Sequence, residues 1–132
     1  MKHFPPNESS APGDIMPDDT IFASISPDTG TPMYTTPADA PLTYTFNEAR
    51  NYASKLNAHG HHDWRVPTKD ELNVLFNNRA GIHGFDETGS VPASWYWSAT
   101  DDDGTAWGQR FDDGFQHWYS QNHESSLRCV RG

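Results

Sequence analysis

The chain has 132 residues and a formal charge of −9, from 18 acidic and 9 basic side chains. This length is enough for one domain with a hydrophobic core, and aromatic residues make up 13% of the sequence, so we expect Trp, Tyr and Phe to fill much of that core. The negative charge argues against nucleic acids, heparin-like polyanions and anionic lipid surfaces as partners, because each of these is bound largely through Lys and Arg.

The first twenty residues are rich in Pro, Ser, Asp and Gly and show no hydrophobic periodicity. We therefore predict a flexible N-terminal arm or linker over residues 1–20 and a folded domain over residues 21–132. No run approaches the ~18 apolar residues of a membrane span, and the N-terminus lacks the apolar segment of a signal peptide. The compartment stays undetermined, with secretion or display at a cell surface as one option.

The folded part is expected to begin with a β-hairpin. Strand-like residues 21–26 and 32–36 flank the tetrapeptide Pro27-Asp28-Thr29-Gly30. Pro fixes φ and Gly permits positive φ, so this tetrapeptide has the chemistry of a turn.

Two helices follow, and each begins with a Thr-x-x-Glu capping box. In this motif the Thr hydroxyl accepts from the amide of the Glu, and the Glu side chain reaches back to the amide of the Thr. Thr45 and Glu48 predict a helix over about residues 46–58, with Gly60 as its stop. Thr68 and Glu71 predict a second helix over about residues 69–78.

After Arg79 the periodicity changes from helical to extended. Residues 81–94 are predicted to form a loop, and strands are expected at residues 95–100, 106–111, 115–120 and 126–131. The order of elements predicts an α+β domain in which two helices pack on a small antiparallel sheet. Cys129 is the only cysteine, which excludes an intrachain disulfide, and its apolar surroundings in the last strand predict a buried, unreactive thiol.

Four motifs in this order carry a family resemblance: DWRVPTKDEL, WYWSAT, AWGQRFDDG and LRCVRG. Over about residues 21–132, the chain resembles the C-terminal domain of Lcl-type bacterial collagen-like adhesins. The resemblance implies a C-type-lectin-like fold, in which the first and last strands pair and the C-terminal third faces outward as a ligand surface. The variable proteins of diversity-generating retroelements share this frame, and formylglycine-generating enzymes resemble it more distantly.

Two activities associated with this frame lack their residues here. The paired cysteines of animal C-type lectins are absent, as are their Glu-Pro-Asn, Gln-Pro-Asp and Trp-Asn-Asp signatures, so calcium-dependent sugar binding is not implied. The reactive cysteine pair of formylglycine-generating enzymes is also absent. We therefore expect no enzyme activity and no cofactor.

The stretch from Trp95 to Tyr119 combines many aromatic residues with many aspartates. Alternate residues of a strand face opposite sides, so Trp97, Trp107 and Phe111 are predicted to lie in the core while the turn aspartates stay in water. Trp118 and Tyr119 are adjacent, and a strand cannot bury both on one face. Exposed rings among Gln, Asn, Ser and His offer rigid contact area together with hydrogen bonds, which is typical of a binding surface. The predicted ligand-binding residues are Tyr96, Asp101, Asp102, Asp103, Arg110, Gln116, His117, Trp118, Tyr119, Asn122 and His123.

Neither cluster of metal-ligand residue types has a recognised spacing. The turn at Asp101–Asp103 lacks the spacing of an EF-hand, so a solvated turn is the favoured interpretation, although calcium binding there stays open. His59, His61, His62 and Asp63 follow a helix in a loop and are interpreted as a polar connector rather than a zinc site.

The leading hypothesis is a non-catalytic, adhesin-like or receptor-binding module whose partner is a protein or glycan on another cell or particle, with a retroelement-diversified variable protein as its narrower version. A second hypothesis is a structural or oligomerisation domain of a larger surface protein, and the oligomeric state stays open. A divergent enzyme or metal-dependent lectin is the third.

Overall fold

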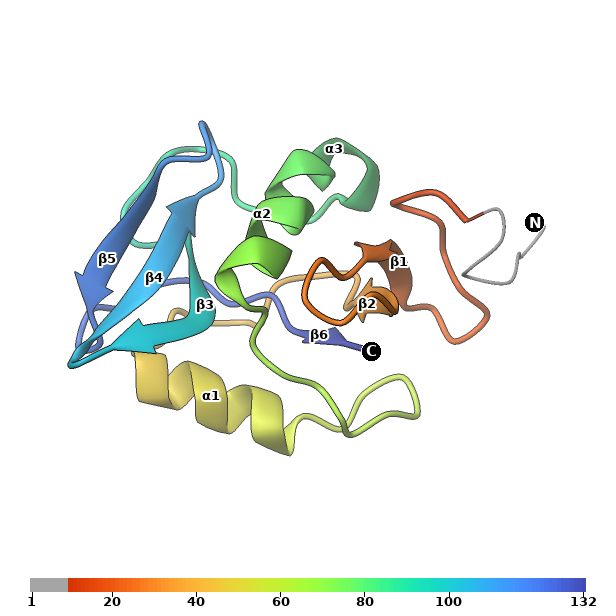
Figure 1. Cartoon of the computed structure of the whole chain (residues 1–132), viewed down its shortest axis with the longest axis horizontal. Coiled ribbons are helices and arrows are strands. Elements are labelled where there is room, and N and C mark those ends of the chain that lie inside the picture. Colours follow the sequence, from red (N-terminus) through yellow and green to blue (C-terminus); the bar gives the residue numbers. More distant parts are fainter. Residues whose placement is uncertain (1–9) are drawn as a thin grey trace.

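The computed structural model describes residues 10–132 and contains two small sheets with helices between and beside them (Figure 1). The first sheet has the strand order β1-β2-β6 and the second the order β3-β4-β5, with all strand pairs antiparallel. The α+β class predicted from the sequence is therefore confirmed. The elements in chain order are β1 (Ile21–Ile25), β2 (Pro32–Thr35), α1 (Phe46–Lys55), α2 (Lys69–Asn77), α3 (Arg79–Ile82), β3 (Trp95–Asp102), β4 (Thr105–Arg110), β5 (Gln116–Ser120) and β6 (Val130–Arg131).

The predicted hairpin and both predicted helix starts are confirmed. Strand β1 pairs with β2, and Gly30 takes a φ of +72° in the turn between them. Thr45 and Thr68 each accept a hydrogen bond from the amide of the Glu three residues later, and each Glu side chain accepts from the amide of its Thr. Both capping boxes are thus complete, which satisfies amide groups that the first turn of a helix leaves free.

The ends of the helices differ from the prediction. Helix α1 ends at Lys55, before the expected residue 58, and Gly60 is not its stop. Instead, His59 and Gly60 take positive φ values in a tight turn that pairs Ala58 with His61. Helix α3 occupies part of the predicted loop, because Asn78 accepts from the amides of the following turn and Ile82 is buried at its end.

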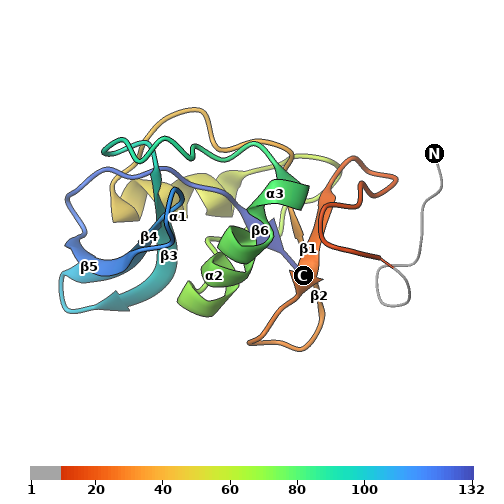
Figure 2. The same cartoon turned by 90° about the horizontal axis from the view of Figure 1, so that it is seen from above.

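Helix α2 lies between the two sheets and contacts β1, β3 and β4, as the view from above shows (Figure 2). Two apolar cores result. One joins α1 to the second sheet and includes Phe46, Trp64 and Trp97. The other joins α2 to both sheets and includes Leu72 and Tyr96.

The prediction of one sheet closed by its first and last strands is wrong. The last strand, β6, pairs with β2 instead of β1, and the second sheet is separate. Only Val130–Arg131 forms a strand at the C-terminus, because the preceding residues, from Ser125 to Cys129, run through the buried interior and meet two partners, Tyr44 and Tyr96, through single bridges.

Residues 10–20 lie against the first sheet. The amide of Gly13 donates to the carbonyl of Phe22, the amide of Phe22 donates to the carbonyl of Asp14, and Met16 is buried. Residues 1–9 of the predicted arm lie outside the described residues. Across the described range, no helix combines the length and apolar character that crossing a bilayer requires.

Candidate functional site

Strand β5 at the edge of the second sheet has two different faces. It pairs with β4 so that Trp107 lies opposite Trp118 and Gly108 opposite His117. Side chains of alternate residues point to opposite sides, so Gln116 and Trp118 share the side of α2, and His117 and Tyr119 share the other side. The residues predicted as one ligand surface are therefore divided between two faces.

On the side of α2, the polar and aromatic side chains of β4 and β5 contact one another and α2. Trp107 donates from Nε1 to Oε1 of Gln116 at 2.8 Å, and its ring meets that of Trp118 edge-on at 4.9 Å. Asn73 of α2 accepts from Gln109, and the Lys69 ammonium lies 5.1 Å from the centre of the Trp107 ring. Trp107 is only half-buried, so its prediction as a core residue is wrong, whereas Trp97 and Phe111 are fully buried as predicted.

The other side carries a continuous row of rings, which we call the aromatic face: Phe115, His117, Tyr119 and His123. Neighbouring ring centres along the row are 6.1, 5.1 and 5.5 Å apart. Phe115 is 53% exposed, and both His117 and His123 are exposed. Exposed rings spaced in this way offer a partner a broad apolar surface with imidazole and phenol groups for hydrogen bonds.

The aromatic face lies on a buried tryptophan. The ring of Trp95, which is 4% exposed, meets Tyr119 at 4.8 Å and Phe115 at 6.1 Å, both edge-on. Gly108 lies beside these rings: a Cβ atom there would be in ordinary contact with the Trp95 and Tyr119 rings and in tight contact, at 3.3 Å, with the carbonyl oxygen of Tyr96. The rings are thus fixed from below by packing, which lowers the entropy cost of binding.

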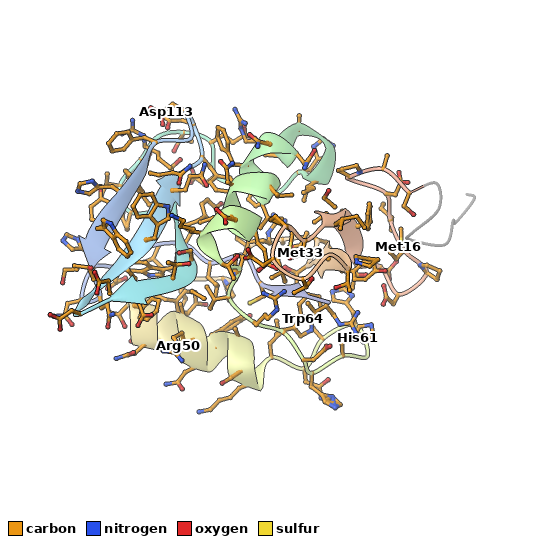
Figure 3. The ribbon with its side chains drawn as sticks, in the orientation of Figure 1. Met16, Met33, Arg50, His61, Trp64 and Asp113 are labelled. Atoms are coloured by element: carbon orange, nitrogen blue, oxygen red, sulfur yellow. The ribbon has the colours of Figure 1, made fainter. Side chains whose placement is uncertain are left out.

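Arg110 is on the same side as the aromatic face but its charge is balanced locally. Its Nε lies 2.9 Å from Asp112 and 3.1 Å from Asp113, and its guanidinium carbon is 5.6 Å from the ring centres of both Trp95 and Phe115. Hydrogen bonds from Arg110 lower the pKa of Asp113, whereas those carboxylates raise the pKa of Arg110. Arg110 therefore braces the β4–β5 turn, where Asp113 lies at the tip (Figure 3).

A small hollow adjoins the end of the row at Tyr119 and His123. Its volume is about 60 Å³, enough to hold a few water molecules. Its lining residues are Val91, Pro92, Trp95, Tyr119, His123, Glu124 and Ser125.

The remaining predicted residues fall into two groups. Asp101, Asp102 and Asp103 are exposed near the tip of the β3–β4 hairpin, and Asn122 is exposed in the turn after β5. The two turns adjoin, because the amide of Gln121 donates to the carbonyl of Gly104 at 3.0 Å. Within residues 10–132, no set of three or more His, Cys, Asp or Glu is placed to hold a metal ion.

Tyr96 is not available to a ligand at the surface, which corrects its predicted role. It is fully buried beneath Phe85 and Phe111, and its hydroxyl donates to Asp39 while accepting from the amide of Asp86. Burial raises its pKa. Alternation along β3 places the Tyr96 side chain on the other face of the sheet from Trp95 and Trp97. It does not reveal that α2 covers the Tyr96 face.

Several residues of the site were missed by the sequence reasoning. Phe115 continues the two-residue period of His117 and Tyr119, so strand alternation could have predicted it. Val91, Pro92 and Glu124 reach the hollow from loops, and no local pattern marks them.

The histidines after α1 have a structural role. Nε2 of His61 lies 2.7 Å from Asp18, and Nδ1 of His59 lies 3.1 Å from the carbonyl of Asp18, which joins this loop to the N-terminal segment. Asp63 pairs with Arg131. Cys129 is 2% exposed, and burial raises its pKa to about 12, which keeps its thiol protonated at neutral pH.

The fold and the site define a small α+β domain with an exposed aromatic face on one of its two sheets. A family model described as the Lcl C-terminal domain matches residues 24–131. This match covers most of the chain, which therefore belongs to the Lcl C-terminal domain family. The resemblance drawn from the four motifs is confirmed at the level of the family. No curated protein sequence matches the chain.

Proposed function

We propose that this domain is a non-catalytic binding module of the adhesin type, with a C-type-lectin-like fold, and that its aromatic face is the surface that binds. One observation carries the proposal: a row of exposed rings is held in place by a fully packed tryptophan. Exposed large rings with fixed conformations are typical of binding hot spots, because they contribute contact area at a low cost in entropy. The partner is a protein or glycan on a cell or particle surface.

The two faces of β5 allow a controlled test. A Phe115→Ala, His117→Ala variant removes exposed rings from the aromatic face, and Trp118→Ala removes an exposed ring from the other face of the same strand. Arrays of glycans and surface proteins would be probed with the parent protein and both variants. We expect the double variant to lose at least about tenfold in affinity for any ligand found, which is the effect of losing about 1.4 kcal/mol, and Trp118→Ala to bind like the parent. Loss only in Trp118→Ala would place binding on the face near α2 and contradict the proposal.

A narrower version is that the domain is a variable protein of a diversity-generating retroelement. Such a system changes adenine positions from a template copy, so the encoding DNA should contain a second, nearly identical segment beside a reverse transcriptase gene. If sequencing of the locus finds neither the template copy nor the reverse transcriptase gene, the domain is not a retroelement variable protein, and the proposal of a binding module is unaffected.

The second candidate is an assembly domain of a larger surface protein. Strand β5 is an edge strand, and the exposed rings beside it are chemically suited to a subunit interface. Light scattering across a concentration series separates the two functions. A monomer at every concentration excludes self-assembly, whereas a dimer that dissociates in the Phe115→Ala, His117→Ala variant supports it.

A further inference from the structure

The surroundings of the aromatic face are strongly acidic. Residues 101–124 contain six carboxylates and one arginine. Two of these carboxylates, Asp112 and Asp113, are paired with that arginine, Arg110. The other four have no ion-pair partner within residues 10–132; they are Asp101, Asp102, Asp103 and Glu124.

These four carboxylates without an ion-pair partner lie toward one end of the row of rings. The β3–β4 hairpin carries three of them beside the turn that follows β5, and both turns lie at the same corner of the molecule (Figure 1). Glu124 stands at the hollow beside Tyr119 and accepts a hydrogen bond from Thr43, which orients its carboxylate. A partner lying along the aromatic face would therefore meet uncompensated negative charge at this end.

The hollow limits the shape of the group that enters it. A hollow of about 60 Å³ with a mostly apolar lining suits a narrow chain of a few methylene groups. Its lining includes the apolar Val91, Pro92, Trp95 and Tyr119 and one acidic residue, the exposed Glu124. An apolar stem that ends in a cation fits both features, since long basic side chains bury their methylene groups while keeping the charge in water.

We propose that the partner of the aromatic face is a basic polypeptide segment, and that the hollow takes one of its lysine or arginine side chains. The stem lies against Trp95 and Tyr119, and the cation pairs with Glu124. Other basic side chains of the segment lie over the exposed ring of Phe115 and the partly exposed ring of Tyr119, because aromatic faces attract cations. This inference rests on the proposed function and names the class of ligand for the same face.

The test uses two synthetic fluorescent peptides of identical length that alternate glycine with lysine or with N-acetyl-lysine. Acetylation keeps the stem and removes the charge. Binding would be followed by fluorescence polarisation with the full chain, at about 20 mM and about 150 mM salt, because screening distinguishes charge pairing from apolar contact. We expect the lysine peptide to bind at least about tenfold more tightly than its acetylated counterpart at the lower salt concentration.

Matched charge variants locate the contact. Glu124→Gln should weaken binding of the lysine peptide by about fivefold, the upper end of the effect of an exposed ion pair. Asp19→Asn removes the same charge at an exposed position beside the first sheet, where the positive φ of +70° suits Asn, and should leave binding unchanged. Equal weakening in both variants would show that the peptide responds to net charge alone and would overturn the proposal.

The outcomes separate this inference from the proposed function. If neither peptide binds, but the arrays yield a ligand that the Phe115→Ala, His117→Ala variant no longer binds, the aromatic face is the site and the class of ligand is wrong. If no ligand of any kind depends on the aromatic face, both proposals fail.

Discussion

At the scale of single residues, two fully buried ionised side chains organise the interior. Arg128 pairs with Asp39 at 2.9 Å, donates to the carbonyls of Thr36 and His83, and lies 4.0 Å from the centre of the Phe85 ring. Burial raises the pKa of Asp39 and lowers that of Arg128. Because all three nitrogens of its guanidinium have partners, Arg128 ties two loops to the last segment of the chain and is a structural residue.

Glu71 is the second buried charge, and its titration links stability to pH. It is fully buried, forms a bidentate pair with Arg65 at 2.6 and 2.8 Å, and accepts from the hydroxyl of Ser26. Burial alone would raise its pKa, but these hydrogen bonds and that from the Thr68 amide lower it from 4.5 to about 2. The stabilisation is therefore complete above pH 4.5 and is lost as the pH falls toward 2.

We predict that Glu71→Gln lowers the free energy of unfolding by about 3 kcal/mol at pH 7, because Arg65 loses its charged partner. The difference between parent and variant should shrink as the pH falls below 4.5, where the parent begins to lose the same interaction. Urea unfolding at several pH values measures both quantities. Glu48→Gln is the matched control: it alters the same position of the other capping box, is exposed and has no arginine partner, so its effect should stay within about 0.5 kcal/mol. A constant difference across the pH range would show that the pair is not the cause.

At the scale of elements, the turn between β4 and β5 sets the direction of the aromatic strand. Gly114 takes a φ of +82° there, and a Cβ atom at this position would lie 2.6 Å from the Phe76 ring of α2. Gly104, in the β3–β4 turn of the same sheet, takes a similar φ of +85° with nothing within 4 Å. Both glycines have a left-handed backbone, which glycine adopts without strain. Only at Gly114 is there also no room for a side chain.

We predict that Gly114→Ala destabilises the domain more than Gly104→Ala. Gly104→Ala, the control, introduces only backbone strain and should lower the free energy of unfolding by about 1–2 kcal/mol. Gly114→Ala also displaces Phe76 and should lower it by at least about 1 kcal/mol more. Thermal unfolding followed by circular dichroism gives the comparison. Equal losses would mean that Phe76 moves aside at no cost and that α2 does not hold the turn.

The same elements show what the sequence could predict. The starts of α1 and α2 and the β1–β2 turn follow from local chemistry, namely two capping boxes and a Pro-Asp-Thr-Gly turn, and all are confirmed. Strand alternation predicts that at least one of His117, Trp118 and Tyr119 is exposed, and His117 and Trp118 are. The burial of Tyr96 and the hollow around Pro92 depend on which distant segment covers which side, and no local pattern encodes that. The predicted C-terminal strand, residues 126–131, is longer than β6 for the same reason, because a buried apolar run resembles a strand whatever its partners are.

At the scale of the whole molecule, the last eight residues join the two sheets. Ser126 exchanges backbone hydrogen bonds with β3, accepting from the amide of Trp97 and donating to the carbonyl of Trp95. A few residues later, Val130 pairs with Thr35 of β2 and with Arg65. The carbonyl of Cys129 also accepts from the hydroxyl of Thr35 at 2.8 Å. This segment therefore passes from one sheet to the other, and Figure 2 shows it running beside α2.

We predict that a chain ending at Arg128 loses cooperative folding, although it retains the whole aromatic face. The truncation removes Cys129 and Val130, which are 2% and 0% exposed, together with strand β6 and the backbone pairing to Arg65. Burial of two such side chains contributes about 3–5 kcal/mol, a large share of the 5–15 kcal/mol that stabilises a typical domain. A chain ending at Arg131 is the control, since it lacks only the exposed Gly132 and one hydrogen bond from Arg65. Thermal melts should show a broad or absent transition for the shorter chain and a melting temperature within a few degrees of the parent for the control. If the shorter chain melts like the parent, the two sheets are held together by α2 alone, and the C-terminal segment is not the link between them.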